Sequence, residues 1–368
     1  MNPTAAQLRA TYAGKKVLLT GHTGFKGAWL TLWLERLGAK VTGLALEAEP
    51  QSVFLAAGVA SSCEHHVADI RDFAQVRGAV EAAKPDIVFH LAAQALVRKS
   101  YAEPLATIET NINGTAHVLE AVRVTQQRCA VVVVSSDKCY ENREWVYGYR
   151  EDDAMGGHDP YSMSKGATEL VTSSWRRSFF PPAKLSEHGV GIASARAGNV
   201  IGGGDWATDR IVPDCIRSLS KGEPIGVRSP HAIRPWQHVL EPLGGYLLLG
   251  VKLLGAARPQ DFCEGWNFGP EAGSAQPVSA LANALVKGWG RGSWVDQSDP
   301  KAHHEASLLR LSIDKAHAKL GWQPRWRFDE TIARTVAWYR AQVDGASAAQ
   351  LKALTLEQIA AWEAAAPS

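Results

Sequence analysis

The first half of the chain alternates between short apolar runs and longer segments of helical period. Runs rich in valine, isoleucine and leucine recur between Lys15 and Arg196, and stretches long enough for a helix separate most of them. This alternation is typical of repeated strand–helix–strand units, which build a parallel sheet with helices on both faces. The sequence therefore predicts an α/β fold with a doubly wound parallel sheet. The expected strands are Val17–Thr20, Val41–Leu46, His65–Ala68, Ile87–Leu91, Val131–Ser135 and Gly191–Arg196.

The character of the sequence changes after Gly198. Glycine, proline and arginine become dense in residues 202–235, and no regular alternation is visible there. We expect residues 1–198 to form the first domain, with returning segments from the C-terminal half. Residues 199–345 should form mainly a smaller, substrate-binding domain, and residues 346–368 a C-terminal helix. Further expected elements are strands at Trp266–Gly269 and Leu311–Ile313, a buried helix at Gly244–Ala257 and a terminal helix at Ala346–Ala365.

Bulk properties exclude several functional classes. The 368 residues are 46% hydrophobic and 21% charged, which is the composition of a compact globular protein. A formal net charge of +2 provides no general field for nucleic acid or anionic lipid, so we expect neither as a partner. The apolar stretch at 244–257 is shorter than the ~20 residues of a membrane helix, and no secretory segment is visible. The five cysteines show no CxxC or metal-ligand spacing, so we expect a cytoplasmic protein without a metal.

A glycine-spaced turn follows the first expected strand. The segment Gly-His-Thr-Gly-Phe-Lys-Gly, residues 21–27, leads from that strand into an apolar helix at residues 28–37. Gly21 would permit the sharp turn, Gly24 would let the backbone approach a pyrophosphate, and Gly27 would let the helix pack closely on the sheet. The context predicts a Rossmann-type dinucleotide-binding site, although a glycine triplet alone also occurs in ordinary loops.

Tyr161 and Lys165 are four residues apart, on a helix that the segment Asp159-Pro160 can start. A lysine ammonium beside a phenol stabilises the phenolate and moves a pKa of ~10 toward working pH, as a general base requires. An isolated pair of this kind is usually an exposed pair on a surface helix. Here it follows the fifth expected strand of a chain with the glycine loop, and Ser136 ends that strand. We therefore predict a catalytic site built from Ser136, Tyr161 and Lys165.

These motifs resemble the extended short-chain dehydrogenases/reductases, whose glycine spacing and Ser-Tyr-Lys triad they match. The resemblance implies NAD as the cofactor, with Asp69 at the adenine amino group and Lys165 at the nicotinamide ribose. The second strand ends without the acidic residue that usually selects NAD over NADP, and the nearest candidate is Glu47. The implied cofactor-binding residues are Gly21, His22, Thr23, Gly24, Phe25, Lys26, Gly27, Asp69, Ile70, Leu91, Ala92, Ala93, Gln94, Thr110, Tyr161 and Lys165.

Asp137 and Lys138 narrow the resemblance to the sugar-nucleotide 4,6-dehydratases, in which an acid/base pair, usually Asp-Glu, follows the triad hydroxyl. Three motifs are similar to the CDP-glucose branch of that family: Ser-Asp-Lys-Cys-Tyr-x-Asn at residues 136–142, the glycine loop, and Leu-Ala-Ala-Gln-Ala-Leu-Val-Arg at residues 91–98. The similarity runs from about residue 14 to about residue 340. It implies CDP-glucose as the substrate, Asp137 as the acid at the 6-hydroxyl and Lys138 as the base at C5. A solvated pair at the end of a loop is the alternative for these two residues.

Polar residues of the second half are candidates for substrate binding. Asn199 follows the sixth strand, where the carboxyl edge of the sheet opens on the ligand crevice. The resemblance implies that Arg210 and Arg234 face the nucleotide diphosphate, whose oxygens suit the planar fork of arginine. Arginines in such loops are also commonly solvated, and tryptophans commonly pack in the core. The further candidates are Arg98, Arg228 and Trp236.

Two other functions share most of these motifs. A sugar-nucleotide 4-epimerase or simple dehydrogenase of the same superfamily needs the triad but leaves Asp137 and Lys138 without a role. A catalytically silent dinucleotide-binding regulator would not need an intact triad. The resemblance also implies a homodimer or homotetramer that pairs through the helices before and within the segment around Tyr161.

Overall fold

A seven-stranded parallel sheet forms the centre of the chain, as a computed structural model shows for residues 4–298 and 308–366. The strand order is β11-β6-β5-β4-β1-β2-β3, and each neighbouring pair is parallel. The order reverses between β1 and β4, which is the point where such sheets open a ligand crevice at the carboxyl ends of the strands. The strands are β1 (Lys16–Thr20), β2 (Lys40–Ala45), β3 (Glu64–Val67), β4 (Ile87–His90), β5 (Ala130–Val134), β6 (Gly191–Ala197) and β11 (Gly265–Phe268).

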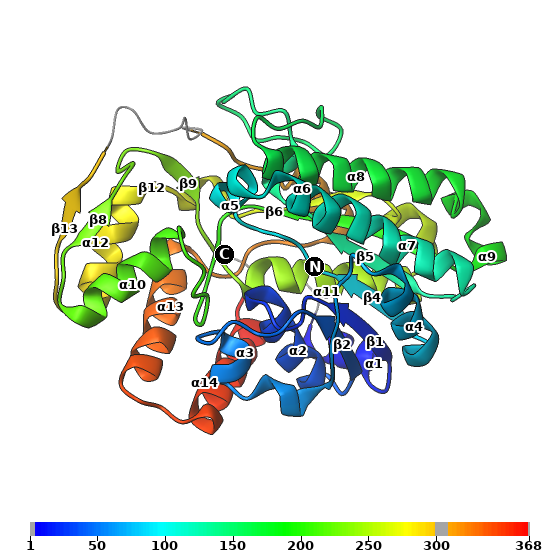
Figure 1. Cartoon of the computed structure of the whole chain (residues 1–368), viewed down its shortest axis with the longest axis horizontal. Helices are drawn as coiled ribbons and strands as arrows, with labels where there is room; N and C mark the ends of the chain where they lie inside the picture. Colours follow the sequence, from blue (N-terminus) through cyan, green and yellow to red (C-terminus); the bar gives the residue numbers. More distant parts are fainter. Residues whose placement is uncertain (1–3, 299–307, 367–368) are drawn as a thin grey trace.

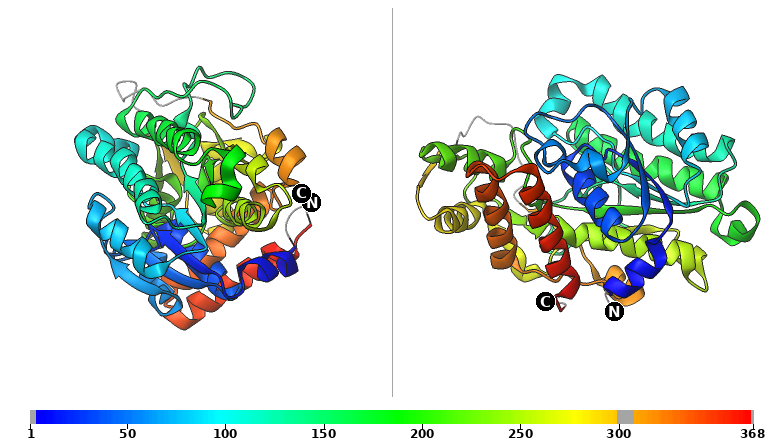
Figure 2. Two further views of the ribbon diagram at one scale, coloured as in Figure 1. Left: turned by 90° about the vertical axis from the view of Figure 1, so that its right-hand side faces the viewer. Right: turned by 90° about the horizontal axis from the view of Figure 1, so that it is seen from below.

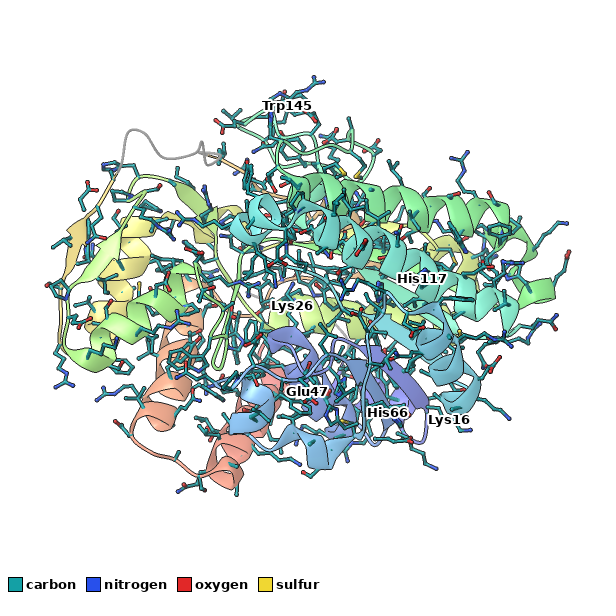
Figure 3. All side chains as sticks on the ribbon, in the orientation of Figure 1. Lys16, Lys26, Glu47, His66, His117 and Trp145 are labelled. Atoms are coloured by element: carbon teal, nitrogen blue, oxygen red, sulfur yellow. The ribbon has the colours of Figure 1, made fainter. Side chains whose placement is uncertain are left out.

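All seven of these strands match predicted strands to within one residue at each end. The doubly wound α/β fold is therefore confirmed. The predicted strand at Leu311–Ile313 is wrong, because Leu311 makes just an isolated bridge to Tyr149. Leu311 is buried in a small separate cluster and not in the sheet. The cluster contains Leu309, Tyr140 and Tyr149, and Trp145 packs against it. Figure 3 shows Trp145 at the outer edge of the molecule.

Helices cover both faces of the sheet (Figure 1). The residues of β5 show why, because Val132 belongs to one hydrophobic core whereas Val131 and Val133 belong to a second core on the other face. Helices α2 and α11 pack on the first face, and α4, α7 and α8 on the second. The first-half helices are α1 (Ala5–Tyr12), α2 (Phe25–Arg36), α3 (Val53–Ala56), α4 (Phe73–Ala83), α5 (Val97–Ala102), α6 (Pro104–Ile108), α7 (Gly114–Val124), α8 (Pro160–Ser178) and α9 (Leu185–His188).

The second half forms a smaller lobe of short strand pairs and helices, at the left of Figure 1. The chain returns from this lobe to the sheet through α11 and β11, so the sheet and its covering helices, here called the sheet half, contain segments from both halves of the sequence. The short strands pair as β7 (Val200–Ile201) with β10 (Gln237–His238), β8 (Ile225–Val227) with β13 (Trp294–Asp296), and β9 (Ile233–Pro235) with β12 (Ala275–Pro277). The helices are α10 (Ile211–Lys221), α11 (Leu240–Gly255), α12 (Val278–Trp289), α13 (Phe328–Val343) and α14 (Ala348–Ala364).

The C-terminal helix α14 corresponds to the terminal helix predicted at Ala346–Ala365, and it packs back onto α2 (Figure 2). Trp362 is fully buried with its ring 5.1 Å from the ring of Trp33. Its indole N–H donates to a carboxylate oxygen of the buried Glu241 in α11 at 2.9 Å. The predicted buried helix at 244–257 corresponds to α11. No helix in the described residues has the length and apolar character needed to cross a membrane.

Candidate active site

The glycine loop between β1 and α2 is closely packed on one side and open on the other. Gly21 has a φ of +77°, and a Cβ atom there would lie 2.6 Å from the backbone nitrogen of Ala92. A Cβ atom on Gly27 would lie 2.1 Å from the carbonyl oxygen of Gly21. Gly24, by contrast, is exposed at the N-terminus of α2, and a Cβ atom there would meet its nearest neighbour at 3.4 Å. This cradle fits the pyrophosphate of a dinucleotide, because backbone N–H groups at a helix N-terminus favour an anion.

The remaining side chains of this loop point inward. His22 is buried, and its Nε2 atom lies 2.6 Å from Nδ1 of His65 on β3. Burial, with a further contribution from the charge of His65, lowers the pKa of His22 to about 4. Thr23 donates to the carbonyl oxygen of Leu46 at 2.9 Å and so ties the loop to the end of β2. His22 and Thr23 therefore hold the loop in shape, and Phe25 begins α2 as a half-buried residue.

Apolar surface is exposed beside the loop at the ends of β2 and β3. Leu46 is 58% and Val67 is 49% exposed, as suits a surface that an adenine ring covers. Ile70 is buried beneath Gly114, whereas the carboxylate of Asp69 is partly exposed and accepts two hydrogen bonds from the guanidinium of Arg71 at 2.8 and 2.6 Å. Glu47, labelled in Figure 3, is exposed near the start of α3.

The segment Leu91-Ala92-Ala93-Gln94 follows β4 and is half-buried. Its last residue is fixed by Asn111, whose Oδ1 atom accepts from the backbone nitrogen of Gln94 at 2.8 Å and whose Nδ2 atom donates to Ser164 of α8 at 2.8 Å. Thr110 precedes Asn111 in the π-helical turn at Glu109–Asn113 and is half-buried. The segment is thereby held between the glycine loop and the helix that carries Tyr161.

Helix α8 begins as the sequence predicts, with Asp159 accepting from the backbone nitrogen of Ser162 at 2.9 Å. Tyr161 and Lys165 are 8% and 4% exposed, and Ser136 hydrogen-bonds to the Tyr161 phenol. The structure thus brings the three triad residues together. Burial raises the pKa of Tyr161 to about 12, opposite to the predicted lowering, because the lost solvation outweighs the hydrogen bond from Ser136. Burial also lowers the pKa of Lys165, to about 8.

Asp137 and Lys138 form a short 3-10 turn, η3 (Asp137–Cys139), directly after Ser136. Asp137 is 4% exposed, and one of its carboxylate oxygens accepts from the Ser136 hydroxyl at 3.0 Å. Its other oxygen has no hydrogen-bond partner among the described residues. Burial raises the pKa of Asp137, although the charge of Lys138 opposes the rise. Lys138 is half-buried, and its backbone nitrogen donates to the Ser136 hydroxyl at 3.2 Å.

Basic side chains from both halves surround these groups. Lys26 lies near the centre of the molecule (Figure 3), where burial and the charges of Arg210 and Lys165 lower its pKa to about 7. Arg210 pairs with Asp205 at 2.6 Å, and its charge acts on the Tyr161 phenol. The charge of Arg234 acts on Asp137. Such a concentration of cations, in a chain with little net charge, suits the diphosphate groups of a cofactor and a substrate.

The other predicted substrate residues occupy different surroundings. Arg98 of α5 and Arg228, which follows β8, both pair with Asp209, at 3.1 and 3.2 Å, so this carboxylate joins the two halves. Asn199 is half-buried after β6, and its carbonyl oxygen accepts from the backbone of Gln237. Trp236 is 3% exposed, and its indole N–H donates to the carbonyl oxygen of Gln276 at 3.2 Å. Trp236 is thus packed inside the second half, and the ligand role considered for it from the sequence stays a prediction.

Sequence reasoning missed the polar residues behind the triad. Glu169 and Arg196 form a buried ion pair at 2.9 Å, and the signal for it was the spacing of Glu169, one helical turn after Lys165. His90 is also buried, between the hydroxyls of Thr20 and Thr115. A cavity of about 730 Å³ is lined by Glu169 and Arg196 on the side away from the triad, and none of the predicted site residues lines it.

Comparison with known proteins agrees with this geometry. A family model described as GDP-mannose 4,6 dehydratase matches residues 18–245. A CDP-glucose 4,6-dehydratase from Salmonella typhimurium is 51% identical over 337 residues, which cover 91% of this chain and 93% of that protein. A dTDP-glucose 4,6-dehydratase from Streptomyces antibioticus is 29% identical, over 70% of this chain and 71% of that protein.

Two solved structures show the same fold. A dTDP-glucose 4,6-dehydratase from Streptomyces venezuelae, solved with NAD bound, superimposes with a TM-score of 0.72 at 23% identity and covers 88% of this chain and 96% of that one. A UDP-glucose 4-epimerase from Thermotoga maritima superimposes with a TM-score of 0.74 at 22% identity, over 89% of this chain and 99% of that one. From the family match and the 51% identity, the chain belongs to the sugar-nucleotide 4,6-dehydratase family, a family of NAD-dependent hydro-lyases.

Proposed function

We propose that this protein is a CDP-glucose 4,6-dehydratase, which converts CDP-D-glucose to CDP-4-keto-6-deoxy-D-glucose and water for deoxysugar synthesis. The choice of CDP-glucose rests on the 51% identical relative of that name. The observation that carries the choice of a dehydratase over an epimerase is Asp137. It is a buried carboxyl group with a raised pKa that lies beside Ser136 and has one oxygen without a partner among the described residues.

NAD is the proposed cofactor, and when bound it accepts the hydride from C4 of the sugar and returns it at C6. The open face at Gly24 and the N-terminus of α2 would hold its pyrophosphate, and Leu46 and Val67 would cover its adenine. Lys165 would hold the nicotinamide ribose. The exposed carboxylate of Glu47 would accept from the adenosine ribose and thereby favour NAD over NADP.

Tyr161 would take the proton of the 4-hydroxyl group as C4 is oxidised to a ketone. Removal of that proton requires the phenolate, which burial opposes. The hydrogen bond from Ser136 and the charge of Arg210 act in the other direction and lower the pKa of the phenol. Both groups are therefore proposed to stabilise the phenolate during this step, in which the Ser136 hydroxyl would donate its one proton to the phenolate instead of to Asp137.

Asp137 and Lys138 would then remove water across C5 and C6. The 4-ketone acidifies the proton on C5, which Lys138 would take as the base, a role that requires its uncharged amine form. Asp137 would donate its proton to the 6-hydroxyl group, so that the C6–O bond breaks and water leaves. Lys138 would then return a proton, exchanged with solvent, to C5 as C6 receives the hydride. The raised pKa of Asp137 suits this role, because a carboxyl group must keep its proton near neutral pH to act as an acid.

Arg210 and Arg234 are proposed to bind the nucleotide diphosphate, one from the start of α10 and one from β9. Asn199, Arg98 and Arg228 are proposed as further substrate contacts. Asp209 holds the two last-named arginines together and so sets the spacing between α5 and the second half.

The test of the proposed function is incubation of the NAD-loaded protein with CDP-glucose, dTDP-glucose and GDP-mannose separately. The alkaline absorbance of a 4-keto-6-deoxy sugar should appear with CDP-glucose. Strong turnover of another nucleotide sugar would contradict the substrate and leave the reaction class standing. Full turnover by Lys138→Met would contradict the assignment of Lys138 as the base.

We also propose that the protein works in the cytoplasm as a homodimer or homotetramer. Five free cysteines in the described chain suit a reducing compartment. Exposed apolar side chains on α6 and α8, Leu105 at 72% and Leu170 at 62%, support pairing through these helices. Mass photometry that finds just monomer at micromolar concentration would reject the oligomer.

A further inference from the structure

A buried hydrogen-bonded cluster next to the triad residues joins α8 to the chain at the ends of β5 and η3 and to strands β6 and β11. Its members come from four separate parts of the sheet half and are each less than 8% exposed. We call it the Glu169 network, and it consists of Ser135, Tyr140, Glu169, Ser194, Arg196 and Asn267.

Glu169 is the centre of this network, one helical turn after Lys165 on α8. The Ser135 hydroxyl donates to one of its oxygens. The other oxygen accepts from the Ser194 hydroxyl at 2.6 Å and from the guanidinium of Arg196 at 2.9 Å. Glu169 therefore ties α8 to the ends of both β5 and β6. Because Ser135 immediately precedes Ser136, this bond also fixes the start of the turn with the proposed acid and base.

Tyr140 anchors the other end of that turn. Its hydroxyl accepts from Arg196 at 2.6 Å and donates to the side chain of Asn267 on β11 at 2.8 Å. The guanidinium of Arg196 also lies 5.1 Å from the Tyr140 ring centroid. The turn η3, residues 137–139, is thus held on both sides by hydrogen bonds, from Ser135 to Glu169 and from Arg196 to Tyr140. Glu169 and Arg196 form one ion pair, so both sides of the turn are fixed to the same pair.

The helix and the turn also meet directly. A Cβ atom on Gly166, the residue after Lys165, would lie 3.2 Å from the carbonyl oxygen of Cys139. A movement of η3 would therefore displace α8 near Lys165, and a movement of α8 would displace η3 near Asp137. The network is the set of contacts that keeps the two in register.

We propose that Glu169 and Tyr140 are positioning residues for two different steps of the reaction. Glu169 acts on the oxidation step by maintaining the charge of Lys165, and Tyr140 acts on the elimination step by holding Asp137 and Lys138 in place. This inference rests on the proposed function, since it assigns the two residues to the oxidation and elimination steps of one dehydration. Neither residue is assigned a contact with the sugar.

The electrostatics agree with this division of roles. Burial works to raise the pKa of Glu169, but the charge of Arg196 and the three hydrogen bonds together lower it, so that Glu169 is ionised. Its negative charge opposes the burial that lowers the pKa of Lys165. Titratable and charged groups facing this pair are Lys26 of α2, His90 of β4, Cys139 of η3, Tyr140, Arg176 of α8 and Arg196 of β6.

The first test is Glu169→Gln, which removes the charge and keeps the shape. Loss of the negative charge lowers the pKa of Lys165 further, so the fall of kcat at high pH should begin on the order of one pH unit lower. The KM for CDP-glucose should stay within about twofold, because the residue does not touch the substrate. Glu241→Gln is the matched control. It removes an equally buried carboxyl group on α11, which bonds to Arg325, Trp326 and Trp362 and not to the Glu169 network, and it should leave the pH profile of kcat in place.

The second test is Tyr140→Phe, which deletes one hydroxyl and leaves the ion pair intact. Its expected signature is a slowed elimination after a normal oxidation, so that the absorbance of the reduced nicotinamide builds up during turnover. Cys139 supplies a readout that needs no cofactor, because this thiol is fully buried at the end of η3. If the turn loosens, a thiol reagent should label Cys139 at least about fivefold faster. Mass spectrometry of the peptide that contains Cys139 measures this labelling rate.

Tyr149→Phe is the matched control for the second test. Tyr149 stacks on Tyr140 with ring centroids 5.2 Å apart, but its hydroxyl bonds to Asn142 and Arg143 in the outer loop instead of to Arg196. It should change neither the elimination rate nor the labelling of Cys139. Should Glu169→Gln fail to fold, Ser135→Ala removes one hydrogen bond to Glu169, keeps the ion pair and should also speed the labelling.

Two outcomes overturn the inference. One is an unchanged pH profile in folded Glu169→Gln, and the other is an unchanged elimination rate and labelling rate in Tyr140→Phe. Both are read against a wild-type protein that turns over CDP-glucose. A wild-type protein inactive on CDP-glucose would instead refute the proposed substrate, and the labelling of Cys139 would still report on the clamp.

Discussion

Gly198 offers a way to move the proposed acid without changing its chemistry. It follows β6, and a Cβ atom there would lie 2.7 Å from the unpartnered oxygen of Asp137. Ordinary contact begins at 3.4 Å, so in Gly198→Ala the carboxyl group must retreat by 3.4 − 2.7 = 0.7 Å. The backbone itself accepts alanine, because Gly198 does not have a positive φ.

A displacement of this size should slow elimination strongly. A misplacement of about 1 Å can cost about 100-fold, so we expect Gly198→Ala to lose about 10- to 100-fold in the elimination step, or about 1.4 to 2.7 kcal/mol. Oxidation at C4 depends on Tyr161 and Lys165 and should stay near the wild-type rate. Stopped-flow absorbance of the reduced nicotinamide separates the two steps, since oxidation produces it and the later steps consume it.

The matched control is Gly78→Ala on the exposed face of α4, where a Cβ atom would meet nothing within 4 Å. This variant should keep both rates and gain about 0.5 to 1 kcal/mol of stability from the added helix propensity. A wild-type elimination rate in Gly198→Ala, with a normal thermal unfolding midpoint, would refute the placement of Asp137 at the 6-hydroxyl group.

Three further variants test other parts of the account. Asp137→Asn keeps the shape of the side chain but has no proton to donate, so product formation should fall by about 10²- to 10⁴-fold while C4 oxidation persists in a single-turnover assay. Gly27→Ala places a Cβ atom 2.1 Å from the Gly21 carbonyl and must displace the loop, so calorimetry should show NAD binding at least about tenfold weaker. Burial raises the pKa of Glu241 from 4.5 to about 7, so its protonation stabilises the folded chain below pH 4.5, and this is lost as the pH rises through about 7. The free energy of unfolding, measured in urea at pH 4.5 and just above pH 7, should fall by about 3 kcal/mol more in the wild type than in Glu241→Gln.

The fold was readable from the sequence because one pattern repeats. A buried parallel strand such as β5 is an apolar run that can be recognised without knowing which strands lie beside it. The segment Leu311–Ile313 shows the limit of that rule, since Leu311, together with Leu309, packs on the aromatic rings of a loop rather than in a sheet. Hydrophobicity predicts burial, but it does not identify what the residue is buried against.

The candidate site was predictable where its residues are adjacent in sequence. Ser136, Asp137 and Lys138 are contiguous, and Tyr161 and Lys165 are one turn apart, so local spacing alone places them together. The partners Glu169 and Arg196 come from different elements, and the ion pair between them forms because α8 packs against β6 in the folded chain. The pKa of Tyr161 was also mispredicted, because the depth of burial around the phenol is a property of the packed fold.

The measurement that tests the central claim most directly is turnover of CDP-glucose with deuterium at C4. If the protein carries out an internal oxidation and return across one sugar, the deuterium should be recovered at C6 of the product, and C5 should carry hydrogen from the solvent. Deuterium recovered at C4 of an epimerised sugar, or lost from the sugar altogether, would contradict the dehydration that we assign to Asp137, Lys138 and Tyr161.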